Sequence, residues 1–262
     1  MSPILIAVIV VASIGLVAGI GLGIASIVFQ VKVNETEQKL LEVLPGANCG
    51  SCSFAGCADY AKALATGKVK TTLCPVGGEE GVRKICAILG VETASTQKKV
   101  AFVHCTGHPG NTPKVVDYKG VMTCRGAKLV CLGETKCKYG CLGHGDCVAA
   151  CQYNAISIVD GVAKVDCSKC RGCGMCVKTC PKNLISLVVA GDTAKVACHN
   201  DDKGAETRAA CSAGCIGCTK CVKTCPNGAI TMINNRASVD TEKCTGCGEC
   251  AASCPVKAIR LN

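Results

Sequence analysis

The stretch that decides the fold occupies residues 169–181 and reads KCRGCGMCVKTCP. It places three cysteines two residues apart, then a fourth after three more residues and directly before a proline. Closely similar runs occur twice more toward the C-terminus. The three sets of cysteines are Cys170, Cys173, Cys176 and Cys180; Cys215, Cys218, Cys221 and Cys225; and Cys244, Cys247, Cys250 and Cys254. This spacing is typical of loops that bind a [4Fe–4S] cluster.

The composition favours iron–sulfur ligation over the other roles of cysteine. The 262 residues include 27 cysteines but no Trp, three Phe and four Tyr, so a large aromatic core is not available. A disulfide scaffold would leave the repeated spacing unexplained, because neighbouring cysteines in such loops rarely pair. Structural zinc sites usually use two separated pairs of ligands, whereas here three ligands come from one tight loop.

The formal net charge of +10 at first suggests a nucleic-acid or membrane-surface partner. An oxidised [4Fe–4S] cluster with four thiolates carries a charge of about −2, so roughly five clusters would bring the loaded protein near neutrality. The chain also has few aromatic side chains on which bases could stack. We therefore expect no nucleic-acid partner.

Residues 4–29 form an apolar run without charged side chains, which predicts a transmembrane helix within residues 1–30. Such a helix would extend about 39 Å, enough to cross a bilayer. A cleavable signal peptide is the alternative, but no basic residue precedes Lys32 and the run is longer than a typical signal core. Because every Lys and Arg follows the run, we expect a single-pass protein of the inner (cytoplasmic) membrane, with its N-terminus outside and its iron–sulfur domains in the cytoplasm.

Residues 31–94 predict a small helical domain that holds one [4Fe–4S] cluster. A capped helix is expected after Asn34, and further helices over residues 58–65 and 79–89. The candidate ligands are Cys49, Cys52, Cys57 and Cys74. Cys86 lies among apolar residues of the last helix, so we interpret it as a buried structural thiol.

Residues 95–130 are expected to connect this domain to the following ones, with a strand over residues 100–103. Cys105, Cys124 and Cys131, with nearby histidines, could hold a sixth metal centre in and after this segment. They lack a tight ligand loop, and packing roles are therefore favoured for them.

Two ferredoxin-like repeats are expected over residues 131–190 and 205–262, which gives the chain an α+β fold. The first repeat begins with a stretched loop that contains Cys137, Cys141, Cys147 and Cys151. β-Hairpins are expected at Asp160–Gly161 and around Asn234–Asn235, and a short helix is expected after each Cys-Pro pair. This order of elements is that of the bacterial two-cluster ferredoxins.

In that layout the fourth cysteine of each run binds the other cluster of its pair. The expected sets are Cys137, Cys141, Cys147 with Cys180; Cys170, Cys173, Cys176 with Cys151; Cys215, Cys218, Cys221 with Cys254; and Cys244, Cys247, Cys250 with Cys225. With the helical domain they predict five [4Fe–4S] clusters. Cys167, Cys198 and Cys211 lie just before ligand loops and have no assigned role. We find no nucleotide-binding or flavin-binding motif and no catalytic residue.

The run NCGSC at residues 48–52, with Cys57 and Cys74, between an apolar N-terminus and ferredoxin repeats, resembles the B subunits of Rnf complexes. These complexes are membrane ferredoxin:NAD+ oxidoreductases that pump Na+ or H+. The resemblance implies a relay subunit, without a catalytic site of its own, within an ion-translocating oxidoreductase. It would take electrons from soluble ferredoxin at the C-terminal repeats and pass them, through the Cys49 cluster, to other integral membrane and cytoplasmic subunits. The alternative is a membrane-tethered polyferredoxin that feeds a soluble reductase without ion transport.

Overall fold

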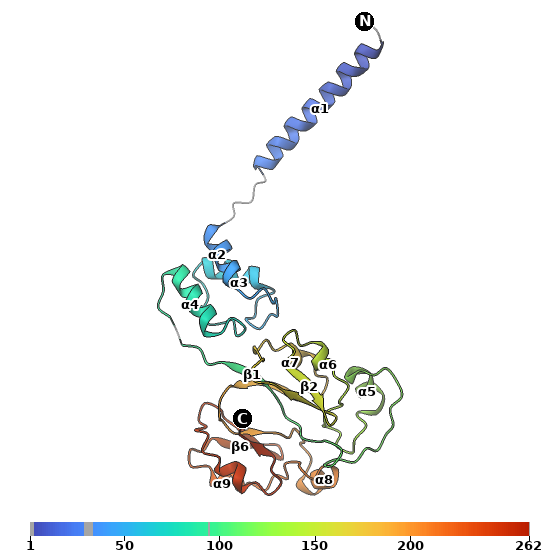
Figure 1. The fold of residues 1–262 in the computed structure, drawn as a ribbon, viewed down its shortest axis with the longest axis vertical. Coiled ribbons are helices and arrows are strands. Elements are labelled where there is room, and N and C mark those ends of the chain that lie inside the picture. The colour runs from blue at the N-terminus through green and yellow to red at the C-terminus, as the bar shows by residue number, and fades with distance from the viewer. Residues whose placement is uncertain (1–2, 29–33, 94, 262) are drawn as a thin grey trace.

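A computed structural model describes residues 3–28, 34–93 and 95–261, and its fold is α+β, as predicted. A long helix, α1 (Pro3–Val28), is followed by a small helical domain and then by a larger body of short strands and helices (Figure 1). The ligand loops of the sequence are therefore divided between two parts of the molecule, the helical domain and the larger body.

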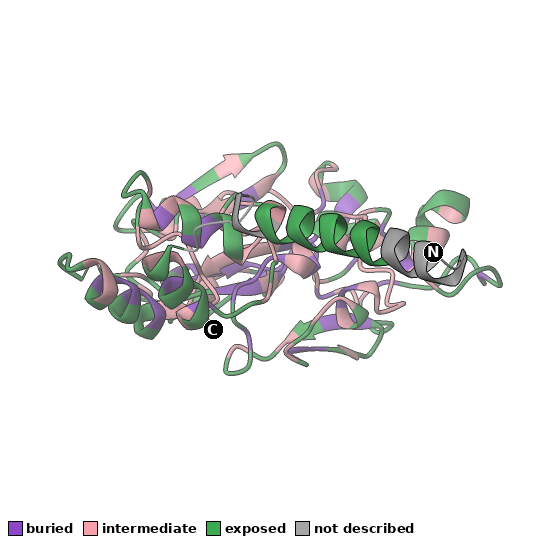
Figure 2. Cartoon of the chain, turned by 90° about the horizontal axis from the view of Figure 1, so that it is seen from above, coloured by how far each residue is buried: buried purple, intermediate pink, exposed green. Residues whose placement is uncertain are grey.

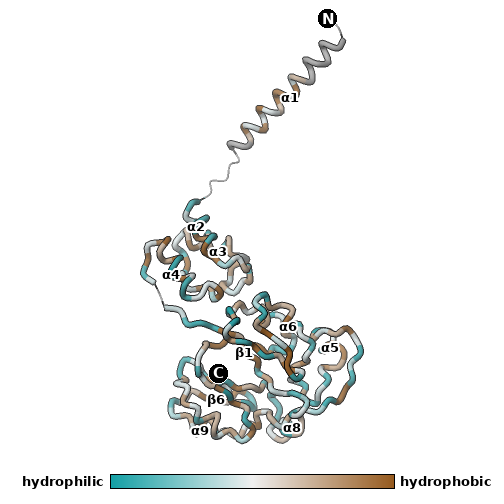
Figure 3. Tube along the Cα trace, in the orientation of Figure 1, coloured by the Kyte–Doolittle hydropathy of each residue, from teal (hydrophilic) through white to brown (hydrophobic). Residues whose placement is uncertain are grey.

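Helix α1 occupies most of the apolar run expected to cross a membrane, and it contains no Asp, Glu, Lys or Arg. The side-chain environments of its residues 12–25 are described, and those of residues 12–24 are exposed (Figure 2). This part is coloured white to brown for hydropathy in Figure 3. Where side chains are described, no helix is both long and apolar enough to cross a membrane. The ends of the expected span, residues 4–11 and 26–29, lie outside that part, so the structure does not confirm the span.

The helical domain consists of α2 (Glu35–Val43), α3 (Cys57–Ala65) and α4 (Gly78–Leu89). The side chain of Asn34 accepts a hydrogen bond from the Thr36 N–H, which confirms the predicted cap of α2. The helices pack around an apolar core made of Leu40, Leu44, Tyr60, Ala61, Leu64 and Ile85. Because this core lies on one side of the domain, the loops that carry the cysteines are left at its edge, next to the larger body (Figure 1).

The larger body contains two structural repeats with the same order of elements. The first repeat comprises β1 (Lys99–Val103), α5 (Cys124–Cys131), α6 (Asp146–Ala149), β2 (Ile156–Val159), β3 (Val162–Val165), α7 (Met175–Thr179) and β4 (Ile185–Val189). The second comprises β5 (Lys195–Val196), α8 (Gly204–Ala210), α9 (Lys220–Thr224), β6 (Ile230–Ile233), β7 (Arg236–Val239), α10 (Glu249–Ser253) and β8 (Ile259–Arg260). Each repeat thus has a first strand, a helix, a ligand loop, a hairpin, a second ligand loop and a closing strand.

The first and last strands of each repeat pair with each other in antiparallel orientation. Ala101 of β1 lies opposite Leu187 of β4, and β5 pairs with β8 in the same way. The pairs β2–β3 and β6–β7 confirm the two predicted hairpins. Asp160 and Gly161 both have positive φ, as the central residues of a tight type I′ turn require.

Each repeat begins earlier in the chain than the sequence indicated. β1 lies within residues 95–130, which were expected to be a connecting segment, and β5 precedes residue 205. The first strand pairs with a strand far along the chain, so local sequence does not show that it belongs to the repeat. The prediction of a short helix after each Cys-Pro pair is wrong. The helix comes before the pair, as α7 does, which ends directly before Cys180.

Apolar strand residues and cysteines share the interior of the body. In the first repeat, buried Val100, Ile156 and Ile185 pack in one cluster with Cys147 and Cys170. A second cluster in the other repeat combines strand residues with cysteines in the same way. The buried residues of the second cluster include Val196, Ile230 and Ile259, which lie on β5, β6 and β8. Cavities lined by thiols therefore take the place of large aromatic side chains in this core.

Candidate iron–sulfur sites

The three regular ligand loops share one backbone shape, which their glycines make possible. Gly172 lies two residues after Cys170 with a φ of +67°, and a Cβ added there would lie 2.5 Å from the carbonyl oxygen of Lys99. Gly217 and Gly246 hold the same position in the other loops, also with positive φ and with a carbonyl oxygen 2.8 and 2.7 Å from an added Cβ. No other residue type fits this close approach without a backbone shift.

A short helix carries the third cysteine of each loop and ends at the fourth. The residue after the second cysteine adopts a left-handed backbone and caps the N-terminus of α7, α9 or α10. The fourth cysteine is the C-terminal cap of the same helix in all three cases. The length of the helix separates the fourth thiol from the first three, so it can contribute to a different site.

The second repeat brings together both of its predicted ligand sets. One cavity is lined by Cys215, Cys218, Cys221 and Cys254. For the other set, burial raises the pKa of the Cys250 thiol, and the charges of Cys244, Cys247 and Cys225 raise it further. Those four residues therefore lie near one another as well.

The first repeat brings together one predicted set, formed by Cys170, Cys173, Cys176 and Cys151. These four cysteines line one cavity. The N–H of Ala101 donates a hydrogen bond to Cys170 Sγ (3.3 Å), and the N–H of Ala155 donates to Cys151 Sγ (3.4 Å). Such N–H···S bonds stabilise thiolate charge and tune the reduction potential of a bound cluster.

The other site of the first repeat differs from the sequence prediction in one ligand. Its cavity is lined by Cys124, Cys141, Cys147 and Cys180. Burial raises the pKa of the Cys147 thiol to about 12, with further contributions from the charges of Cys141, Cys124 and Cys180. Cys137, which the sequence prediction placed in this set, lines a different cavity.

The presence of Cys124 at this cavity, in place of a cysteine from the loop, is explained by a histidine in the loop sequence. Residues 141–151 read CLGHGDCVAAC, so His144 stands where the regular loops have their second cysteine. The His144 side chain is buried, and its Nε2 lies 3.1 Å from Oε1 of Glu134. Its ring also lies edge-on to that of Tyr118. The His144 side chain does not line the cavity, whereas Cys124 does.

Helix α5 is held so that its first residue, Cys124, reaches the loop. The side chain of Thr123 caps the helix by accepting a hydrogen bond from the Gly126 N–H (3.0 Å). The carboxylate of Asp146, at the start of α6, accepts hydrogen bonds from the N–H groups of Cys124 (2.9 Å) and Arg125 (3.1 Å). These bonds join the start of α5 to the loop that carries Cys141 and Cys147.

The sequence contained a signal for the first ligand of this loop. Gly143 lies two residues after Cys141 and has positive φ, and an added Cβ would approach the carbonyl oxygen of Gly161 to 2.7 Å. Gly145 caps α6 with a left-handed backbone. These glycines match those of the regular loops and identify Cys141, not Cys137, as the first cysteine. Nothing in the local sequence indicated Cys124, because it belongs to another element.

In the helical domain, Cys52, Cys57 and Cys74 pack beside the core, and Cys49 lies in the same loop as Cys52. Burial raises the pKa of the Cys74 thiol, and the charges of Cys52 and Cys57 add to this shift. The loop also contacts the larger body. Ser51 Oγ donates a hydrogen bond to the carbonyl oxygen of Cys173, and Lys178 Nζ donates to that of Cys49 (3.1 Å).

Six of the seven remaining cysteines divide into two groups, and the seventh is half-buried Cys167. Cys105, Cys137, Cys198 and Cys211 line one further cavity. Cys86 and Cys131 instead donate hydrogen bonds through their thiols, to Thr71 Oγ1 (3.5 Å) and to the carbonyl oxygen of Ala127 (3.3 Å). Cys105, Cys124 and Cys131, suggested together as a sixth metal centre, therefore lie in three different environments.

The donor sets fit [4Fe–4S] clusters by their chemistry. In the described part of the chain, no three His, Cys, Asp or Glu side chains could hold a single metal ion. A cubane makes a different demand, because each thiolate binds its own iron and the four ligands surround a cavity. Iron also favours deprotonation of the thiols, which burial alone opposes.

Family models match the iron–sulfur portions of the chain. Residues 44–76 match a model described as an Fe-S cluster. Residues 169–230 and residues 214–258 each match a model described as a 4Fe-4S dicluster domain. The matched regions include the cysteine loop of the helical domain and all three regular loops of the body.

Several curated proteins are similar over most of their length. The B subunit of the ion-translocating oxidoreductase complex of Methanosarcina acetivorans is 43% identical over 263 residues, which covers 100% of both chains. The B subunit of the Na(+)-translocating ferredoxin:NAD(+) oxidoreductase complex of Acetobacterium woodii is 42% identical, over 93% of this chain and 73% of its own. The B subunit of the proton-translocating ferredoxin:NAD(+) oxidoreductase complex of Clostridium ljungdahlii is 37% identical, over 92% and 85% respectively.

Proposed function

The chain belongs to the B-subunit family of ion-translocating oxidoreductase (Rnf) complexes, and we propose that it relays electrons from soluble ferredoxin to the other subunits of such a complex. The membership confirms the family resemblance inferred from the sequence. The observation that carries the proposal is the series of cavities in one body, each lined by four cysteines. A relay needs several one-electron carriers in close succession, and bound [4Fe–4S] clusters supply such carriers.

Five ligand sets belong to this proposal. They are Cys49, Cys52, Cys57 and Cys74; Cys151, Cys170, Cys173 and Cys176; Cys124, Cys141, Cys147 and Cys180; Cys215, Cys218, Cys221 and Cys254; and Cys225, Cys244, Cys247 and Cys250. The chain serves as a relay without a catalytic site of its own, since thiols that all bind iron leave no open position for a substrate.

The contacts between sets support an order of transfer. The loop of Cys49 touches that of Cys173 through the hydrogen bonds of Ser51 and Lys178. Within the first repeat, the charge of Cys176 contributes to the raised pKa of the Cys147 thiol, so the two sites are neighbours. The helical domain therefore follows the first repeat in the path toward the membrane subunits.

The second repeat is the proposed place of electron entry. All 27 cysteines lie in described residues, and the two exposed ones, Cys218 and Cys247, both belong to this repeat. An exposed ligand brings a bound cluster close to a docked donor. Lys220 and Lys223 of α9 are also exposed and would attract an acidic ferredoxin surface.

Membrane attachment through α1 is part of the same proposal. The exposed side chains of α1 include Leu16 (66% exposed), Val17 (70%) and Leu22 (73%). Apolar exposure of this extent on one helix marks a surface that is in contact with lipid or another protein. A bilayer, with the N-terminus outside and the remaining chain in the cytoplasm, would supply that cover. A chain that begins at residue 34 should then leave the membrane fraction but keep its iron, whereas continued membrane association through that chain alone would refute the role of α1.

Isolation of the complex tests the relay. We expect the full chain, extracted in mild detergent, to co-purify with integral membrane subunits, and reduced ferredoxin to drive NAD+ reduction together with Na+ or H+ movement in vesicles. Both ions should be measured, because the relatives are named for one or the other. Recovery of the chain alone, reducible by ferredoxin but without ion movement, would favour the tethered polyferredoxin instead.

A further inference from the structure

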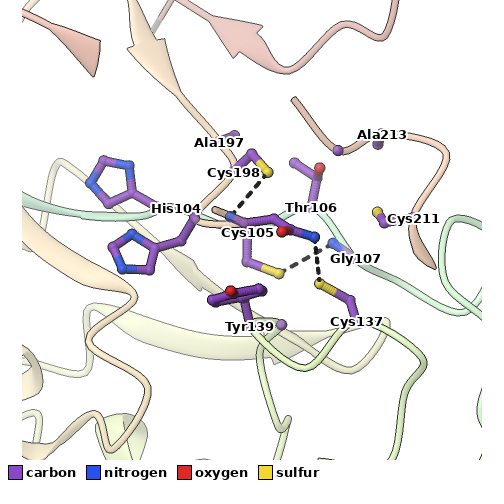
Figure 4. Close-up of a pocket in the computed structure, with 14 residues that line it drawn as sticks. His104, Cys105, Thr106, Gly107, Cys137, Tyr139, Ala197, Cys198, Cys211 and Ala213 are labelled. Carbon is purple, nitrogen blue, oxygen red and sulfur yellow. Dashed lines mark hydrogen bonds between the residues drawn. The ribbon is translucent and has the colours of Figure 1, made fainter. Parts of the chain in front are cut away.

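Four cysteines outside the five sets come from separate segments and face one region between the two repeats (Figure 4). Cys105 follows β1, Cys137 precedes the first ligand loop, Cys198 follows β5, and Cys211 caps the C-terminus of α8. Their cavity is lined by four cysteines, as are the three cavities described above. Four thiols from four separate segments therefore converge on one space, as a [4Fe–4S] cluster requires.

Three of the four thiols accept hydrogen bonds, as several of the proposed cluster ligands do. Cys105 Sγ accepts from the N–H groups of Gly107 and Cys141, each at 3.3 Å, and Cys198 Sγ accepts from the N–H of Asn200 at 3.5 Å. The buried side chain of Asn200 also donates from Nδ2 to Cys137 Sγ at 3.9 Å. Three of these bonds appear beside the cavity in Figure 4: those to Cys198 and to Cys137, and the one from Gly107 to Cys105.

This pattern separates ligand thiols from structural ones. Cys170, Cys151, Cys244 and Cys254 each accept a bond from a backbone N–H, at 3.3–3.4 Å. The thiols of Cys86 and Cys131 instead donate hydrogen bonds, in each case to an oxygen atom. N–H groups directed at sulfur suit a thiolate, whereas an S–H donor must keep its proton.

We propose that Cys105, Cys137, Cys198 and Cys211 bind a sixth [4Fe–4S] cluster, which provides the electronic connection between the two ferredoxin-like repeats. The ligand assignment stands on the cavity and its hydrogen bonds. Its role as a connection rests on the proposed relay function. Each transfer oxidises one neighbouring centre and reduces the next by one electron, and no bond is formed or broken.

The position of the site explains why a connection is needed there. Cys105 accepts a hydrogen bond from Cys141, a ligand of the first repeat. On the other side, burial raises the pKa of the Cys198 thiol, while backbone N–H groups of Asn200 and Cys215 oppose this shift. Cys215 is a ligand of the second repeat. The cavity therefore contacts one site of each repeat, and it gives the six sites a continuous order from the exposed second repeat to the helical domain.

Iron analysis of the full-length, detergent-purified chain tests the ligand set. We expect about 24 iron and 24 sulfide per wild-type chain. Cys105→Ser and Cys198→Ser, from opposite sides of the cavity, should each lose about four iron while circular dichroism is unchanged. Cys131→Ser is the matched control and should keep all iron. A wild-type count near 20 that neither variant lowers would overturn the sixth cluster.

A second variant covers the case in which loss of a ligand unfolds the chain. Asn200→Asp keeps the oxygen that accepts the Asp202 N–H but replaces the amide donor to Cys137 with a negative charge. Redox titration followed by electron paramagnetic resonance should show one centre shifted to lower potential and the others unchanged. No shift, or a shift of a centre that Cys218→Ser removes, would contradict the proposal. If Cys218→Ser itself removes no iron, the proposed relay fails instead.

Discussion

The two ferredoxin-like repeats have the same order of strands, loops and helices, yet they obtain their ligands differently. In the second repeat, two regular loops contribute all the cysteines of both sites. In the first repeat, His144 replaces one loop cysteine, and Cys124 from α5 lies at the same cavity. The glycines that shape the loop are present in both repeats. The comparison shows that the loop backbone and the origin of its thiols are separable, because a cluster requires four thiols around a cavity and not four thiols on one segment.

The difference has a consequence for the space between the repeats. Once Cys124 completes the first site, Cys137 is available to a cavity that borders both repeats. In the second repeat, Cys198 precedes α8 and Cys211 follows it. Both cysteines come before the loop that begins at Cys215, as Cys137 comes before the loop that begins at Cys141. The first repeat thus contributes two thiols, those of Cys105 and Cys137, to the place where the two repeats meet.

The largest loss of iron is expected when Cys124, the proposed ligand from α5, is replaced. Cys124→Ser should lose about four iron atoms per chain, as fully as Cys218→Ser does in the regular repeat. Cys131→Ser, at the other end of α5, should keep all iron because its thiol only donates to the carbonyl oxygen of Ala127. Iron and sulfide analysis of the three purified variants measures the difference. Equal loss in the two α5 variants would show that the helix, not the Cys124 thiol, is what matters.

Restoring the regular pattern should reverse that loss. In the double variant Cys124→Ser with His144→Cys, residue 144 supplies the thiol at the position that Cys173 holds in the neighbouring loop. Gly143 and Gly145 already give the loop the required backbone, so we expect the four iron atoms to return. Electron paramagnetic resonance of the reduced protein checks that the regained centre is a [4Fe–4S] cluster. An iron content no higher than that of Cys124→Ser would show that the two loops are not equivalent.

A smaller effect should come from the loop backbone alone. Gly172→Ala combines a left-handed φ with a Cβ close to the Lys99 carbonyl oxygen, and we expect a destabilisation of roughly 2–4 kcal/mol. Gly228→Ala shares the left-handed φ but has open space around the added Cβ, so its cost should be about 1 kcal/mol. The temperature at which cluster absorbance disappears compares the two. Equal temperatures would mean that the close approach is relieved without cost.

The smallest effect concerns the exposed surface of the regular repeat. Replacing both Lys220 and Lys223 with Glu should slow reduction by ferredoxin several-fold at low salt and less at high salt, because the charges act on the encounter. Lys62→Glu on α3, in the helical domain, is the control and should leave the rate unchanged. Stopped-flow absorbance measures both rates. An equal decrease in the two variants would place the docking surface elsewhere.

Much of the fold could be predicted from the sequence where the signal was local. The hairpins at Asp160–Gly161 and at residues 234–235, the cap at Asn34 and the helices of the small domain all depend on residues close together in the chain. Local sequence could not predict that β1 pairs with β4, or that α5 packs against the loop that carries Cys141 and Cys147. They depend on contacts between segments that are distant along the chain.

The sequence by itself determined that this protein is an iron–sulfur protein with repeated ligand loops, because cysteine spacing and glycine position encode a loop around a cubane within a few residues. It also determined the family to which the chain belongs. Only the tertiary structure decided which thiols share a cavity when they come from different elements, as Cys124 does in one site and Cys105, Cys137, Cys198 and Cys211 do in another. The physical reason is that a cluster site is defined by four sulfur atoms converging in space, and convergence between distant segments is set by strand pairing and helix packing.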